Sequence, residues 1–217
     1  MSARTRGVLF DLDGTLLDTA PDMAAALNAL RREHNLEALP LATIRPFVSH
    51  GGKAVLRLGF PNLTEEEVPQ YLERLLHLYH AGIANETQPF EGMLELLEQR
   101  EGGAIHWGVV TNKVGWLTLP LMEEMRLHMR ASAIVCGDTL SVRKPDPAPL
   151  LHAAELMQVE PGTCLYVGDA ERDMIAARAA GMRGLGARFG YIGADESVAH
   201  WPAHGWIDAP LEVLQWL

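Results

Sequence analysis

Two aspartates separated by one residue, Asp11 and Asp13, follow a short apolar run near the start of the chain. Just after a strand, side chains at this spacing can point to the same region. Two carboxylates at one place repel each other unless a cation lies between them, and Mg²⁺ prefers such hard oxygen ligands together with substrate phosphate. The pair therefore predicts a magnesium site. Gly14 permits a tight turn after it, and Thr15 offers a hydroxyl and an amide to phosphate oxygens.

A second acidic pair, Asp169 and Asp173, follows another apolar run. A spacing of four residues across a strand-to-helix turn lets both carboxylates face one metal ion or the groups around it. An alternative for these residues is an N-terminal helix cap, where aspartate interacts well with the helix dipole. We expect Asp169 to bind the metal directly, and Asp173 to bind it directly or to support a ligand.

Two more polar clusters supply groups for a phosphate. Thr111 and Asn112 come at the end of an apolar run and can donate hydrogen bonds to phosphate oxygens, although an ordinary turn would use the same residue types. Lys144 stands before a proline, which favours an extended and fixed backbone. Beside the aspartates it is expected to be the cation that offsets the carboxylates and the phosphate. Together the clusters predict magnesium-dependent phosphoryl transfer.

The clusters depend on short apolar segments that place them. Each segment is too short and too β-branched to be a helix, and each precedes a stretch with helical periodicity. These predicted strands are Val8–Phe10, Gly108–Val110, Ala133–Val135 and Leu165–Val167. Alternating strands and helices imply a parallel sheet, and ligands of such sheets bind beyond the carboxyl ends of the strands. The sequence therefore predicts an α/β fold, a doubly wound parallel sheet on which the clusters converge at one crevice.

Roughly a hundred residues separate the first strand from the next strand with a polar end, too many for an ordinary crossover. Helical patterns occupy this gap, at Ala20–Arg32 and Glu65–Ala81. We predict that residues 17–86 form a small α-helical cap domain, inserted into an α/β core domain made of residues 1–16 and 87–217.

A turn inside the predicted cap, Ser49–Lys53, is expected to begin another helix. It is the part of the cap best placed to reach the site. His50, Gly52 and Lys53 are therefore candidate substrate-binding residues, and a solvent-exposed loop is the alternative for His50 and Lys53.

The composition limits the partners of the protein. A chain of 217 residues with a formal net charge of -10 lacks the basic face that a nucleic acid or an anionic membrane would require. No apolar run approaches the ~20 residues of a membrane helix, and no signal region precedes the first strand. Cys136 and Cys164 fall in or beside predicted strands and are expected to be reduced. These features predict a cytoplasmic protein. From the motifs above we expect its partner to be a small-molecule phosphate ester, and we expect a monomer or homodimer.

The motifs, in this order and with an insert after the first, resemble the haloacid dehalogenase superfamily, in its phosphatase branch with a small helical cap. The resemblance covers the whole chain, and the stretch Val8–Pro21 looks most like the phosphoglycolate phosphatases. Other features are also similar to the related N-acetylmuramic acid 6-phosphate phosphatases, namely Ser49 with Gly51 and Gly52, Trp107–Lys113 and Arg188–Ile192. The resemblance implies a 2-phosphoglycolate phosphatase, with an N-acetylmuramic acid 6-phosphate phosphatase as the alternative.

The resemblance also implies roles for the residues. Asp11 would attack phosphorus and form an aspartyl-phosphate, and Asp13 would act as general acid and then general base. Mg²⁺ would be held by Asp11, the backbone carbonyl of Asp13 and Asp169. The transferred phosphoryl group would be bound by Thr111, Asn112 and Lys144.

Other activities of the superfamily fit the residues less well. Dehalogenases lack the second carboxylate of the first motif, and phosphonate-cleaving relatives replace it, so Asp13 argues against both. A β-phosphoglucomutase-like activity keeps both aspartates and stays open. A non-catalytic binding module would be expected to have lost at least one of four residues that are all present, namely Asp11, Asp13, Lys144 and Asp169.

Overall fold

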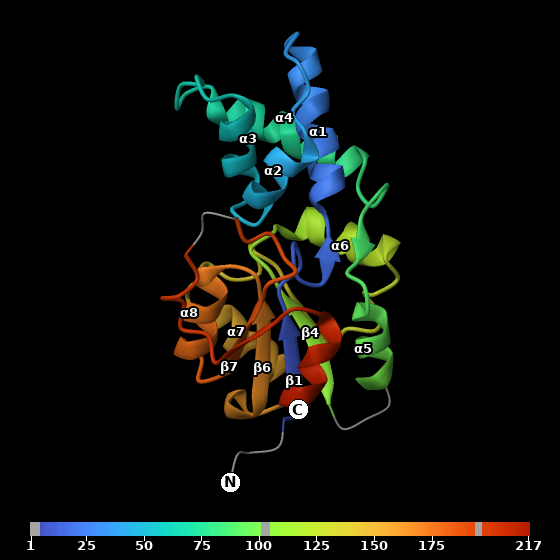
Figure 1. Ribbon diagram of the computed structural model, residues 1–217, viewed down its shortest axis with the longest axis vertical. Helices are drawn as coiled ribbons and strands as arrows, with labels where there is room; N and C mark the ends of the chain where they lie inside the picture. Colours follow the sequence, from blue (N-terminus) through green and yellow to red (C-terminus); the bar gives the residue numbers. More distant parts are fainter. Residues whose placement is uncertain (1–4, 101–104, 194–196) are drawn as a thin grey trace.

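The computed structural model describes residues 5–100, 105–193 and 197–217. A six-stranded sheet forms one half of the molecule (Figure 1). The first four helices of the chain, α1–α4, lie beyond one end of its strands. The order of the strands is β5-β4-β1-β6-β7-β8, and every neighbouring pair is parallel. Their bounds are β1 Gly7–Phe10, β4 His106–Val110, β5 Ala133–Val135, β6 Cys164–Gly168, β7 Arg183–Ala187 and β8 Gly205–Ile207. The predicted α/β parallel sheet is confirmed.

The register of the central strands brings their carboxyl ends together. Phe10 at the end of β1 pairs with Val109 of β4 on one side and with Val167 of β6 on the other. The chain therefore leaves all three strands at the same edge of the sheet, toward the four helices above it.

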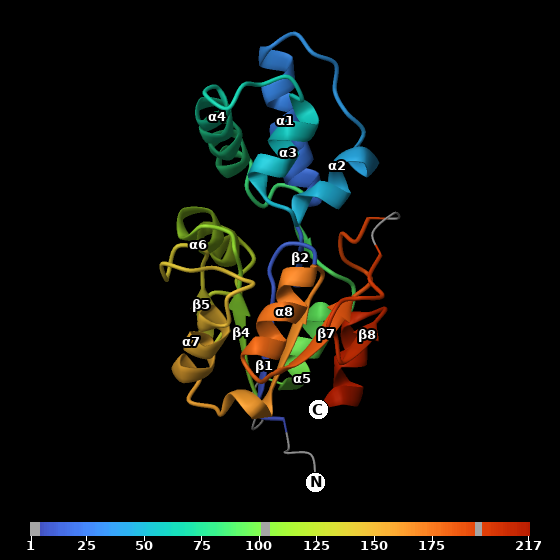
Figure 2. The same cartoon turned by 90° about the vertical axis from the view of Figure 1, so that its left-hand side faces the viewer.

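Helices cover both faces of the sheet (Figure 2). The helices are α5 Met93–Arg100, α6 Gly115–Glu124, α7 Ala148–Leu156 and α8 Glu171–Ala179, with a 3₁₀ helix, η2, at Pro210–Trp216. Val8 and Phe10 pack in the same cluster as residues of α5, α6 and η2, whereas Leu9 packs with residues of α7 and α8. Because both faces are buried, β1 is apolar throughout instead of alternating.

The remaining four helices pack around a core of their own. They are α1 Ala20–Glu33, α2 Leu41–Val48, α3 Gly52–Gly59 and α4 Val68–Ala81, and we call them the helical unit. Leu27, Leu56 and Leu75 are fully buried between these helices. Two short strands connect the unit to the sheet, β2 Leu17–Asp18 and β3 Gln88–Pro89, and they pair antiparallel.

The helix predictions in this segment are confirmed. α1 matches the first expected helical pattern, and α4 matches the second from Val68 onward, so that helix begins later than the predicted Glu65. Pro21 and Pro69 lie in the first turns of these helices, and the turn after α2 does begin α3. At 14 residues each, α1 and α4 are among the longer helices, and none of the described helices combines the length and the apolar character needed to cross a membrane.

Candidate active site

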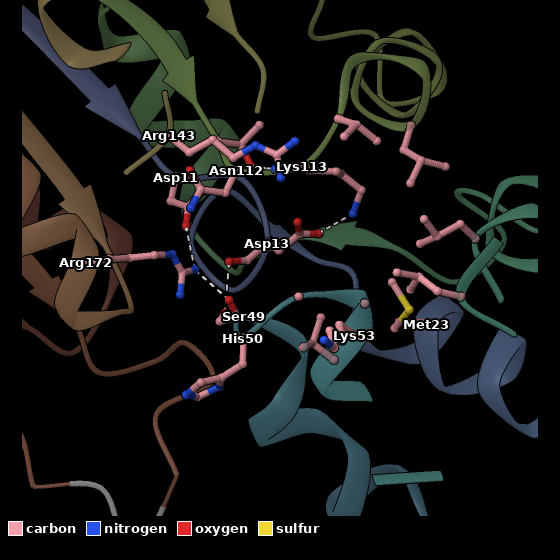
Figure 3. Close-up of a pocket in the computed structure, with 18 residues that line it drawn as sticks. Asp11, Asp13, Met23, Ser49, His50, Lys53, Asn112, Lys113, Arg143 and Arg172 are labelled. Atoms are coloured by element: carbon pink, nitrogen blue, oxygen red, sulfur yellow. Dashed lines mark hydrogen bonds and ion pairs between the residues drawn. The ribbon is translucent and has the colours of Figure 1, made fainter. Parts of the chain in front are cut away.

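A pocket of about 470 Å³ lies between the carboxyl ends of the central strands and the helical unit (Figure 3). From the strand ends it is lined by Asp11, Asp13, Thr111, Asn112 and Lys113. From the helical unit it is lined by Met23, Val48, the turn from Ser49 to Lys53, Leu72 and Leu76. The remaining lining residues are Val114, Leu117, Arg143 and Arg172. The pocket thus has a mostly polar floor at the strand ends and a roof that combines apolar side chains with Ser49, His50 and Lys53.

Three aspartates form a buried cluster next to this pocket. Ligand oxygens of Asp11, Asp169 and Asp173 all lie within 4.8 Å of one another. Oδ1 of Asp169 is buried and has no hydrogen-bond partner in the described parts of the chain. Burial first, and then the charges of Asp11 and Asp173, raise the pKa of Asp169 to about 7. A divalent cation would pair the orphaned oxygen and offset this repulsion, so the donor set fits such an ion.

Asp13, which the resemblance implies as a metal ligand through its backbone carbonyl, turns its carboxylate away from this cluster. Its Oδ1 accepts hydrogen bonds from Thr19 Oγ1 at 2.6 Å and from Lys113 Nζ at 2.7 Å. Its backbone carbonyl lies 3.4 Å from Ser49 Oγ, which donates to Asp169 at 2.7 Å. The carbonyl is therefore the group of Asp13 on the side of the cluster. The carboxylate lies at the floor of the pocket, where it can reach a substrate (Figure 3).

Lys144 contacts the cluster and is absent from the lining of the pocket. Its side chain is fully buried, with Nζ 2.9 Å from Asp11 Oδ1 and 2.8 Å from Asp173 Oδ1. The Tyr166 hydroxyl is 2.6 Å away. Asn112 fixes this lysine, because its side-chain oxygen accepts from the Lys144 amide and its nitrogen donates to the Lys144 carbonyl. The side chain of Asn112 therefore positions the Lys144 backbone, and the amine of Lys144 contacts Asp11 and Asp173.

The environment of Asp11 keeps its carboxylate ionised. Burial raises the pKa of Asp11, but Lys144 and then Arg172 lower it, and the net shift is downward. The Leu12 amide donates to Oδ1 at 2.7 Å. An ionised and oriented carboxylate at the pocket floor is suited to nucleophilic attack.

The turn after Asp13 brings the chain close to Asp169. Gly14 has a φ of 77°, and a Cβ at this position would overlap the Asp169 carboxylate. Thr15, which follows, is fully buried, and its hydroxyl has no partner among the described residues and does not line the pocket. Thr111 does line the pocket, and its hydroxyl accepts from the Lys113 amide at 3.1 Å.

The three residues predicted in the turn of the helical unit all line the pocket. Gly52 is the first residue of α3. His50 is exposed, with Nδ1 3.1 Å from the Pro46 carbonyl, and Lys53 is 60% exposed with its amine 3.3 Å from Glu65. Neither side chain makes a contact with the aspartate cluster in the described structure.

Sequence reasoning assigned no role in the site to four polar residues that line the pocket, namely Ser49, Lys113, Arg143 and Arg172. Ser49 joins the helical unit to Asp169, and Arg172 Nη2 donates to the Ser49 carbonyl at 2.6 Å while lying 3.9 Å from Asp11. Lys113 pairs with Asp13. Lys113 follows Thr111-Asn112 directly and Arg172 lies between the two predicted aspartates, so proximity to these motifs was the available signal.

Comparison with known proteins places the chain in a family. The sequence model of the haloacid dehalogenase-like hydrolases matches residues 8–187. A phosphoglycolate phosphatase from Xanthomonas campestris is 42% identical over 209 residues, which cover 94% of this chain and 93% of that protein. An N-acetylmuramic acid 6-phosphate phosphatase from Pseudomonas aeruginosa is 37% identical over 212 residues, with 97% and 94% covered.

A solved structure agrees with these matches at the level of the fold. A predicted phosphoglycolate phosphatase from Haemophilus somnus superposes with a TM-score of 0.86 at 24% identity, covering 98% of both chains. The family model spans most of the chain, and the relatives cover nearly all of it. The chain therefore belongs to the haloacid dehalogenase-like hydrolases, as its motifs predict.

Proposed function

We propose that this protein is a magnesium-dependent phosphatase that hydrolyses 2-phosphoglycolate through an aspartyl-phosphate on Asp11. The observation that carries this proposal is the divergence of two neighbouring carboxylates. Asp11 lies in the buried aspartate cluster beside Lys144, whereas Asp13 faces the pocket and pairs with Lys113. In this proposal one carboxylate attacks phosphorus, and the other exchanges a proton with the leaving group. The activity named for the Xanthomonas relative supports the choice of substrate.

In the proposed reaction, the ionised Asp11 oxygen attacks phosphorus, and the bond from phosphorus to the ester oxygen breaks. Asp13 donates a proton to the departing alkoxide, and then removes one from the water that hydrolyses the aspartyl-phosphate. Lys144 holds the attacking carboxylate in place. Asp11, Asp169 and the Asp13 carbonyl would hold Mg²⁺, supported or joined by Asp173. When bound, that ion would neutralise charge on the phosphoryl oxygens.

The phosphoryl group itself would contact Thr111 and the backbone of Asn112, which both line the pocket. The helical unit, residues 17–86, would act as the cap domain over a core of residues 1–16 and 87–217. Closed over the pocket, it would exclude water and contact the leaving group through His50, Gly52 and Lys53. We place this chemistry in the cytoplasm.

A second candidate substrate is N-acetylmuramic acid 6-phosphate. The pocket of about 470 Å³, with leucine and methionine side chains on its roof, has room for a leaving group larger than glycolate. The activity named for the Pseudomonas relative supports this alternative. Sugar phosphates are bulkier than 2-phosphoglycolate, so the two candidates differ in how much of the roof they would contact.

The test is phosphate release with Mg²⁺ from a panel of 2-phosphoglycolate, N-acetylmuramic acid 6-phosphate, hexose phosphates and nucleoside monophosphates. We expect kcat/KM for 2-phosphoglycolate to exceed the others by about 100-fold, a difference of about 2.7 kcal/mol in transition-state binding. A similar preference for the muramic acid ester would establish the second candidate. Isomerisation of a hexose 1-phosphate without phosphate release would identify a mutase and refute the phosphatase.

A further inference from the structure

One cation of the pocket occupies a distinctive position beside Asp13. Nζ of Lys113 lies 2.7 Å from Asp13 Oδ1 and 3.0 Å from the hydroxyl of Tyr79, and 4.5 Å from the centre of the Tyr79 ring. The Lys113 side chain is only 7% exposed, yet the residue lines the pocket. Tyr79 belongs to α4, so a residue of the helical unit and a residue that follows β1 together hold this ammonium group. Figure 3 shows the Lys113 side chain directed at Asp13.

An ammonium group has three N–H bonds. Among the described residues, two of them are used by Lys113, toward Asp13 and Tyr79. One donor therefore remains for a ligand in the pocket. Because the lysine is largely removed from water, a charge-assisted hydrogen bond from it is stronger than one from an exposed lysine.

We propose that Lys113 recognises the substrate through a carboxylate located one carbon away from the ester oxygen. This inference rests on the proposed function, in which Asp13 protonates that ester oxygen. An oxygen in contact with Asp13 lies close to Lys113 Nζ as well, since the two side chains are 2.7 Å apart. In 2-phosphoglycolate a single methylene carbon separates the ester oxygen from the carboxylate carbon. The carboxylate therefore falls within reach of Lys113.

The two candidate substrates differ in the position of their carboxylate relative to the phosphate ester. N-acetylmuramic acid 6-phosphate also has a carboxylate, but it belongs to the lactyl group at O3, across the sugar ring from the phosphate at O6. With its ester oxygen at Asp13, that carboxylate would lie far from Lys113. Lys113 thus selects for phosphate esters of α-hydroxy acids.

The other cations near the pocket are placed less favourably for this role. Lys53 is 60% exposed and already paired with Glu65. Arg172 donates to the Ser49 carbonyl and faces Asp11, on the side of the aspartate cluster. Arg143 donates to the Gly137 carbonyl at 2.5 Å. Of these cations, Lys113 alone contacts the proposed proton donor.

The test compares two substrates in Lys113→Met, which removes the charge and keeps the length of the side chain. 2-Hydroxyethyl phosphate has the same chain length as 2-phosphoglycolate, with a hydroxymethyl group in place of the carboxylate. Any effect of Lys113 on Asp13 acts on both esters and cancels in the ratio of their kcat/KM values. We expect the preference for 2-phosphoglycolate to fall about 100-fold in Lys113→Met, the magnitude of a lost charged hydrogen bond.

Arg74→Met is the matched control, since Arg74 is on α4 like Tyr79 but pairs with Glu33 and does not line the pocket. This variant should keep the wild-type ratio. An equal loss on both esters in Lys113→Met would overturn the proposal and leave Lys113 with a role toward Asp13 alone. A fall of the ratio in Lys53→Met instead would also overturn it. If the wild-type protein has no activity on any phosphate ester, the proposed function itself is refuted. That outcome is distinct from an equal loss on both esters in Lys113→Met, which refutes only the role of Lys113.

A second variant covers the case in which Lys113→Met does not fold. Tyr79→Phe removes one acceptor of Lys113 without leaving a buried charge unpaired. Without this acceptor the Lys113 amine is no longer held in its orientation toward the substrate carboxylate, so we expect the KM for 2-phosphoglycolate to rise about 5-fold and the KM for 2-hydroxyethyl phosphate to stay unchanged. Unchanged KM values for both esters would contradict the proposal.

Discussion

Ser49 Oγ donates a hydrogen bond of 2.7 Å to Oδ2 of Asp169, although 120 residues separate them in the chain. Ser49 is the residue after α2 in the helical unit, whereas Asp169 follows β6 in the sheet. The Tyr191 amide donates to the same oxygen at 2.9 Å, which leaves Oδ1 of Asp169 for a metal ion. The helical unit therefore helps to orient the carboxylate that we propose as a metal ligand.

Ser49→Ala should weaken magnesium binding. Removing a hydrogen bond that orients a ligand typically costs about 10-fold or more in metal affinity. The Mg²⁺ concentration for half-maximal phosphate release should rise by about that factor, and Ser49→Thr, which keeps a hydroxyl, should stay closer to wild type. An unchanged Mg²⁺ dependence in Ser49→Ala would show that Tyr191 alone orients Asp169.

Asp11→Asn should abolish turnover and preserve the fold. The substitution keeps the volume of the side chain but removes the attacking charge, so phosphate release should fall by about 10³-fold or more. Asp146→Asn is the matched control, because Asp146 is exposed and its side chain accepts from the Ala148 amide, away from the aspartate cluster. Circular dichroism checks the fold of both variants. Appreciable turnover by Asp11→Asn would exclude the covalent mechanism.

Chelation of divalent metal should stop the reaction and lower Tm. Without a cation, Asp11, Asp169 and Asp173 are buried together, and Mg²⁺ that binds only the folded state stabilises it by mass action. Asp169→Asn should remove most of the Mg²⁺-induced rise in Tm measured by calorimetry. Ca²⁺ should bind but inhibit, since its longer and looser coordination would misplace the phosphoryl group. Activation by Ca²⁺ would contradict the site as described.

Asp22→Ala should destabilise the junction between the helical unit and the sheet. Asp22 is buried in the first turn of α1, and it accepts hydrogen bonds from the Glu86 amide, the Thr87 amide and the Thr87 hydroxyl. Leaving these donors unpaired should lower the free energy of unfolding by about 2–4 kcal/mol, measured with urea. Asp22→Asn, which retains an acceptor oxygen, should cost less. If both variants lower the free energy of unfolding equally, the charge of Asp22 matters more than its hydrogen bonds.

Both cysteines should be unreactive in the folded protein. They are buried and free, and burial raises the pKa of the Cys164 thiol to about 11 and that of Cys136 above its usual value. A disulfide-exchange reagent at about pH 8 should label neither thiol until denaturant is added. The raised pKa also means that stability falls as the pH rises from about 9 to 11, because the unfolded thiol of Cys164 loses its proton first. In Cys164→Ala the free energy of unfolding should fall less over this pH range.

Much of the architecture follows from local patterns in the sequence. The apolar runs at β1, β4, β5 and β6 are short and buried on both sides, so composition alone marks them as strands. The polar residues that follow them meet because parallel strands end at the same edge. β7 is different: its sequence, Arg-Gly-Leu-Gly-Ala, has no β-branched residue, and it becomes a strand through its pairing with β6 and β8.

The roles within the site depended on contacts between distant segments. The spacing of Asp11 and Asp13 determined that two carboxylates stand together, whereas the tertiary structure decided that one faces Lys144 and the other Lys113. Likewise Thr15 and Asn112 have the residue types of phosphate ligands, but packing buries the first and the Lys144 backbone engages the side chain of the second. Residue type and spacing are local properties of the chain. The direction of a buried side chain is set by partners from other elements, which only the folded structure brings within reach.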